Sequence, residues 1–108
     1  MGEMVIAMYR PHEGKDAELR ELIARHMPAL RAEGLVTDRP ATLMRAGDGT
    51  YLEVFEWKPG ASSAAHTNPA VQAVWGPMME VADFPALGDL AEAGGRFPHF
   101  EPIDGLTA

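Results

Sequence analysis

Apolar residues recur along the chain with two different periods, which predict alternating strands and helices. Residues 4–9 form a short, nearly continuous apolar run, typical of a strand buried on both faces. Pro11 and Gly14 then interrupt the chain. From Lys15 to Glu33 the apolar positions recur at helical spacing, which predicts a helix. The apolar stripe of this helix consists of Leu19, Leu22, Ile23, His26 and Leu30.

The middle of the chain predicts a β-hairpin. Residues 41–46 and 50–58 are rich in strand-forming side chains, and Gly47-Asp48-Gly49 connects them. A short glycine-containing loop between two apolar runs is typical of a hairpin.

A second helix is predicted to begin after the hairpin, at Asn68 and Pro69, a typical N-cap and first-residue pair. Residues 97–103 predict a last strand. We expect it at an edge of the sheet, because Pro98 and Pro102 have no N–H to donate.

The order of these elements predicts a single α+β domain over residues 1–108. A β-α-β-β-α-β chain is expected to form a ferredoxin-like, four-stranded antiparallel sheet with two helices on one face. The strand over residues 50–58 is apolar on both faces, so the second face also needs a cover. We expect a second subunit there, giving a homodimer, and the alternative is that residues 83–96 fold back as a lid.

Composition and charge exclude several classes of function. The chain has 9 Lys and Arg against 16 Asp and Glu, a net charge of −7, with no clustered basic face, so we expect no nucleic-acid partner. There is no cysteine, which excludes disulfides and thiolate nucleophiles. No apolar run reaches the roughly 20 residues of a membrane helix, and no signal peptide is recognisable. We therefore expect a cytoplasmic protein with no membrane partner.

Three segments resemble the dimeric α+β-barrel superfamily. They are Pro11-His12-Glu13-Gly14-Lys15, Asp48-Gly49-Thr50-Tyr51-Leu52-Glu53 followed by Phe55-Glu56-Trp57, and Ala65-His66-Thr67-Asn68-Pro69-Ala70-Val71. The chain is most similar to the antibiotic biosynthesis monooxygenase group and its stress-type relatives. The resemblance implies that two sheets pair into a dimeric α+β barrel. The superfamily includes cofactor-free monooxygenases of aromatic polyketides, haem-degrading enzymes and proteins with no known activity.

Two histidines are the candidate catalytic residues. His66 lies just before the predicted cap of the second helix, where it can act as an acid or base at the mouth of a pocket. His26 lies on the apolar stripe of the first helix. The alternatives are that His66 only caps the turn and that His26 is a satisfied core residue. The side chains expected to line the pocket, or alternatively to form core or dimer interface, are Tyr51, Phe55, Trp57, Asn68, Trp75 and Met78.

Glu53 shares a strand face with large aromatic side chains, so it needs a partner if it is buried. We expect this partner to be Arg45 or a residue of the other subunit. No metal site is predicted, because the histidines at 12, 26, 66 and 99 lack paired ligand spacing, although His66, His99 and Glu101 can still meet in space.

Three functional hypotheses follow. The first is a homodimer that binds a small apolar or aromatic compound and oxidises it without a cofactor, with His66 as acid or base and His26 as its helper. The second is a non-catalytic dimeric binding or stress-response protein. The third is haem binding or degradation, for which the resemblance implies iron ligation by His66 beside Trp57. The first strand lacks the asparagine of the haem-degrading relatives, which argues against the third.

Overall fold

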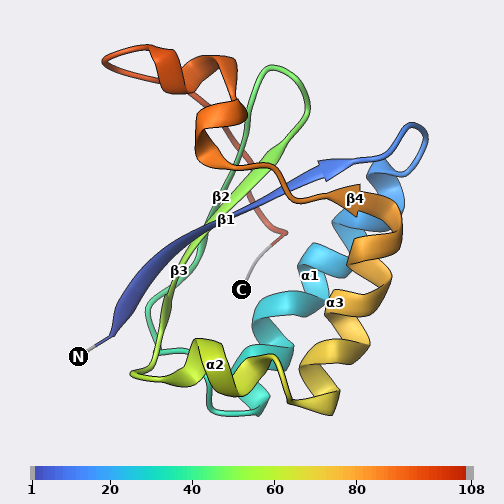
Figure 1. Ribbon diagram of the computed structural model, residues 1–108, viewed down its shortest axis with the longest axis vertical. Helices are drawn as coiled ribbons and strands as arrows, with labels where there is room; N and C mark the ends of the chain where they lie inside the picture. The colour runs from blue at the N-terminus through green and yellow to red at the C-terminus, as the bar shows by residue number, and fades with distance from the viewer. Residues whose placement is uncertain (1, 107–108) are drawn as a thin grey trace.

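The computed structural model describes residues 2–106, in which an antiparallel sheet packs against helices (Figure 1). The sheet has the strand order β4-β1-β3-β2-β5. Its strands are β1 (Glu3–Pro11), β2 (Thr42–Arg45), β3 (Tyr51–Trp57), β4 (Ala82–Asp83) and β5 (Glu101–Pro102). The helices are α1 (Asp16–Ala32), α2 (Ala61–Ala65) and α3 (Pro69–Val81), and two 3-10 turns follow, η1 (Leu87–Asp89) and η2 (Ala91–Gly94).

The structure confirms the predicted helices and hairpin, and local chemistry explains their ends. The Asn68 side chain accepts hydrogen bonds from the backbone N–H groups of Ala70 and Val71 at 2.9 and 3.1 Å, which caps α3. Gly49 in the hairpin loop has φ +94°, a backbone conformation that favours glycine. Helix α2 was not predicted, because its small residues show no apolar periodicity.

The prediction of four strands was wrong, and the sheet has five. Residues 97–103 contribute only β5, which pairs with β2, and the short strand β4 pairs with the end of β1. Ala82, at the end of α3, is already extended, so the chain passes from helix to strand with no loop between them. No turn-forming residue marks this transition in the sequence, and Pro98 and Pro102 limit the length of β5.

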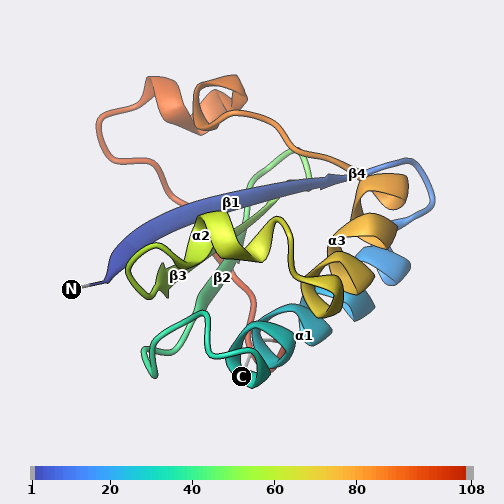
Figure 2. The same ribbon diagram turned by 60° about the horizontal axis from the view of Figure 1, so that its bottom comes forward.

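The two faces of the sheet are covered differently. Helices α1 and α3 lie against one face, and the segment that carries η1 and η2 crosses the other face (Figure 2). On that second face Leu90 packs with Ala46 and Leu52, so the segment covers only one end. Met4 and Ile6, further along β1, remain 52% and 42% exposed. Within the described residues, no helix has both the length and the apolar character needed to cross a membrane.

Candidate functional site

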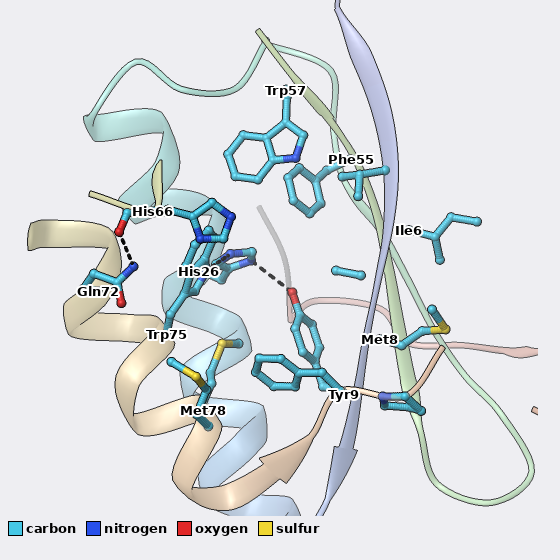
Figure 3. Close-up of a pocket in the computed structure, with 15 residues that line it drawn as sticks. Ile6, Met8, Tyr9, His26, Phe55, Trp57, His66, Gln72, Trp75 and Met78 are labelled. Carbon is cyan, nitrogen blue, oxygen red and sulfur yellow. Dashed lines mark hydrogen bonds between the residues drawn. The ribbon is translucent and has the colours of Figure 1, made fainter. Parts of the chain in front are cut away.

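A cavity of about 630 Å³ lies between the sheet and α3 and extends around the free edge of β1 (Figure 3). Strand β4 pairs with β1 only at Arg10 and Pro11, so residues 3–9 have no strand neighbour on that side in the described chain. Ile6 and Met8, on the outer face of β1, therefore line the cavity together with residues of the helix-covered face. The lining residues are Val5, Ile6, Ala7, Met8, Tyr9, His26, Phe55, Trp57, His66, Gln72, Trp75, Met78, Met79, Phe84 and Pro85.

The lining is mostly aromatic and aliphatic, with few polar groups. None of these lining residues, all within the described chain, is Lys, Arg, Asp or Glu. Ligand pockets in proteins have volumes of roughly 300–1,000 Å³ and combine apolar walls with a few well-placed polar groups. The cavity has these properties and suits an uncharged compound better than an anion.

A buried polar network forms part of the cavity wall. Glu53 Oε1 accepts a hydrogen bond from the Tyr9 hydroxyl at 2.9 Å and lies 2.7 Å from His26 Nδ1. The Tyr9 oxygen and His26 Nδ1 are 3.5 Å apart, the contact drawn as a dashed line in Figure 3. This contact is long because the same carboxylate oxygen holds both groups. Three residues from β1, α1 and β3 thus form one network.

Trp75 determines the tautomer of His26. The indole Nε1–H of Trp75 donates to His26 Nε2 at 2.9 Å, and an indole N–H can only donate. His26 Nε2 must therefore be an unprotonated acceptor, so the ring proton lies on Nδ1 and is donated to Glu53. An imidazolium would place two N–H groups against each other at Trp75. The network therefore pairs a neutral imidazole with a carboxylate.

The network lacks one hydrogen-bond donor. Glu53 Oε2 is buried and has no hydrogen-bond partner among the described residues. Tyr9 stays protonated, because burial, together with the nearby Glu53 carboxylate and its hydrogen bond, raises the pKa of the Tyr9 hydroxyl well above its ordinary value. A proton taken up at His26 Nε2 would give an imidazolium beside the Glu53 carboxylate, which is an arrangement suited to general base chemistry.

The expected pocket residues divide into two groups. Phe55, Trp57, Trp75 and Met78 line the cavity. Tyr51 and Asn68 do not.

Tyr51 is fully buried beside α1, where its hydroxyl donates to Asp16 at 2.7 Å and accepts from Arg20 at 3.0 Å. Asn68 caps α3 and donates to Glu33 at 2.9 Å. Both side chains therefore stabilise the packing of helices rather than the cavity wall.

His66 and His26 occupy different parts of the site. His66 is exposed at the cavity mouth, where its ring packs edge-on against Trp75 with the ring centroids 5.2 Å apart. Its backbone carbonyl accepts a hydrogen bond from Gln72 at 3.1 Å. His26 is buried and hydrogen-bonded. The geometry therefore gives His26 the partner that an acid or base needs, whereas no hydrogen bond to the His66 ring forms within residues 2–106.

The expected pairing of Glu53 with Arg45 was wrong. The Arg45 guanidinium instead lies over the Tyr51 ring and contacts Glu101 of β5 at 3.2 Å. The partners of Glu53 are Tyr9 and His26. The pairing of His26 with Glu53 could have been predicted from the sequence. The apolar stripe of the first helix carries His26, the inward face of the strand carries Glu53, and buried polar groups need partners.

The described residues offer few ligands for a metal ion. Among the described residues, no group of three or more His, Asp or Glu side chains is placed to hold a metal ion. His66 and Trp57, the residues that the haem hypothesis names, both line the cavity, whereas the lining includes no Lys or Arg to pair with haem propionates.

Fold and site together define an α+β protein with an apolar cavity backed by a histidine–carboxylate pair. No protein-family model, curated protein or solved structure matches the chain.

Proposed function

We propose that the protein binds a neutral apolar or aromatic small molecule in this cavity, with His26 as a proton acceptor supported by Glu53. The observation that carries the proposal is that His26, which is paired with the buried Glu53, lines a cavity of about 630 Å³ whose lining has no Lys, Arg, Asp or Glu. His26 takes the main catalytic role in this proposal, because it alone of the two candidate histidines is paired with a carboxylate.

Binding can be tested with a neutral fluorescent dye such as Nile red, titrated into the wild-type protein and two matched variants. Ala7 and Ala41 are both half-buried alanines, but only Ala7 lines the cavity. Ala7→Leu should weaken dye binding about tenfold by filling the cavity, and Ala41→Leu should leave it unchanged. Equal effects of the two variants, or no binding to the wild type, would contradict the proposal.

The family resemblance extends the proposal to cofactor-free oxygenation of a quinol-like compound. Removal of a proton from such a compound gives an electron-rich anion, which is the form that reacts with dioxygen. Oxygen uptake with a naphthoquinol should exceed the uncatalysed rate, and His26→Gln should abolish the excess. His66→Gln serves as the control and should retain most of it. An uptake no faster than the uncatalysed rate, together with normal dye binding, would instead favour a non-catalytic binding protein.

We also propose that the working form is a homodimer. On the sheet face beyond the reach of Leu90, Met4 and Ile6 of β1 are exposed, and Glu56 lies opposite Met4 with its carboxylate bound by Thr37 and Arg39. Ile6 belongs both to this face and to the cavity lining, so a second subunit on the face would also close the cavity at the free edge of β1.

Light scattering of the purified protein should give twice the 11.7 kDa mass of one chain. Ile6→Lys should give the mass of a monomer, whereas Phe97→Lys, at an 81% exposed residue outside the sheet, should stay dimeric. A wild-type protein that remains monomeric at every concentration would refute the dimer.

A further inference from the structure

One hydrogen bond in the cavity wall joins two of its lining residues, His26 and Trp75. The Nε2 atom of His26 accepts the Nε1–H of Trp75 at 2.9 Å. Trp75 is only half-buried and belongs to α3, whereas His26 is held from the other side by Glu53 of β3. The bond at Nδ1 is therefore made with the buried Glu53, whereas the bond at Nε2 is made with a residue that lines the cavity.

We propose that the ligand is a neutral aromatic compound with a hydroxyl group. On binding, this hydroxyl replaces the Trp75 indole as the hydrogen-bond donor to His26 Nε2. This inference rests on the proposed function and names the ligand class of the same site. Trp75 is then a positioning residue, which keeps His26 in the Nδ1–H tautomer until a hydroxyl arrives.

The chemistry of the site selects an uncharged hydrogen-bond donor. Only a donor can replace the indole at Nε2, so an ether or a ketone cannot. An ammonium group would meet no carboxylate among the described lining residues, and a carboxylate would meet no lysine or arginine there. An acidic aromatic hydroxyl is neutral when it enters and carries a donor, and, unlike an indole N–H, it is acidic enough to give its proton to an imidazole.

The same hydroxyl can then transfer its proton. The O–H bond breaks as the Nε2–H bond forms, so that the ligand becomes an aryloxide and His26 becomes an imidazolium. The imidazolium is stabilised through Nδ1–H by the Glu53 carboxylate, at the present distance of 2.7 Å. Tyr9 keeps its own proton and continues to donate to the same carboxylate oxygen.

The resting tautomer is tested without any ligand. Long-range ¹H–¹⁵N NMR of the wild-type protein should show a protonated Nδ1 and an unprotonated Nε2 for His26. Trp75→Phe should shift the Nε2 resonance, because phenylalanine has no donor. Trp57→Phe is the matched control, since Trp57 also lines the cavity but forms no hydrogen bond to His26. A His26 protonated at Nε2 in the wild type would overturn the inference, whatever the cavity binds.

Ligand exchange is tested with 2-naphthol and 2-methoxynaphthalene, which share a ring system but differ in the donor. In the wild type, 2-naphthol should shift the His26 Nε2 resonance and 2-methoxynaphthalene should not. Trp75→Phe should tighten binding of 2-naphthol about tenfold relative to the methoxy compound, because the competing donor is gone, and Trp57→Phe should not change this ratio.

The outcomes separate the two proposals. If both compounds bind equally well to the wild type and to Trp75→Phe, and the Nε2 resonance does not move, the exchange is refuted while the binding function stands. If neither compound nor Nile red binds to folded protein, the binding function and the exchange that depends on it both fail.

Discussion

The two faces of the sheet differ in how deeply they are buried, although β1 and β3 carry apolar residues on both faces. On the helix-covered face, Phe55 is 2% exposed and even the carboxylate of Glu53 is fully buried, with two hydrogen-bond donors at one oxygen. On the opposite face, Leu90 covers one end, while Met4 and Ile6 stay exposed. One face packs against helices around the cavity and buries a carboxylate, and the other leaves apolar residues of β1 exposed.

The comparison shows why the fully buried carboxylate lies on the helix side. A buried carboxylate is tolerated only where several donors can reach it from different elements. Helix α1 supplies His26 and β1 supplies Tyr9. On the opposite face the Glu56 carboxylate, bound by Thr37 and Arg39, stays partly exposed, and the covering segment contributes the apolar Leu90.

Deleting a large side chain from each face tests the contrast most directly. Phe55→Ala should lower the free energy of unfolding by about 3–5 kcal/mol, because it removes a 2% exposed ring that packs against His26 and Trp57. Ile6→Ala should cost about 0.5 kcal/mol in dilute protein, because the side chain is exposed there. Urea unfolding at several protein concentrations measures both. Equal losses at every concentration would remove the distinction between the faces, whereas a loss for Ile6→Ala that grows with concentration would indicate a second copy on that face.

Removing the carboxylate tests the polar network of the covered face. Glu53→Leu leaves the Tyr9 O–H and the His26 Nδ1–H without an acceptor, at about 1–3 kcal/mol each. Leucine recovers part of this through apolar burial, so we expect a net loss of about 2–4 kcal/mol. Glu53→Gln retains an acceptor oxygen and should lose only about 1 kcal/mol. Thermal unfolding would contradict the network if the leucine variant were the more stable of the two.

Truncating the covering segment tests the other face. Leu90→Ala should cost about 2 kcal/mol, since Leu90 is buried against Ala46 and Leu52. Leu87→Ala, three residues earlier and largely exposed, is the control and should change stability by about 0.5 kcal/mol or less. Amide hydrogen exchange in residues 86–100 should rise in the Leu90 variant alone. Unchanged exchange there would show that Leu90 does not hold the segment down.

The smallest expected effect is a pH dependence from Tyr9. Its pKa is raised in the folded protein above the ordinary value of 10.0, so its contribution to stability is complete below pH 10 and falls as the pH rises further. Tyr9→Phe should therefore cost about 1–2 kcal/mol at pH 7 and progressively less above pH 10. Tyr51→Phe leaves Tyr9 in place, so its free energy of unfolding should still fall above pH 10. A difference between wild type and Tyr9→Phe that is independent of pH would contradict the assignment.

Residues of the candidate site differ in how well local pattern predicted them. Phe55, Trp57, Trp75 and Met78 were expected near a pocket because strand and helix periods place them on inward faces, and they line the cavity. Tyr51 lies on the same strand face as Phe55 but packs under the N-terminal end of α1, where its hydroxyl forms hydrogen bonds with Asp16 and Arg20. A strand face specifies burial, but not which part of the opposing helix lies above each residue.

The amino-acid pattern by itself determined α1, the hairpin, the Asn68 cap and the inward placement of His26 and Glu53, because each depends on residues only a few positions apart. Tertiary structure alone decided that His26 and Glu53, 27 residues apart, form a hydrogen bond and that Trp75 donates to the other imidazole nitrogen. It also decided that β4 forms at residues 82–83 and leaves most of the β1 edge free. The physical reason is that periodicity defines the inward face of each element, whereas hydrogen bonds between elements depend on how their axes cross and in which register they pack.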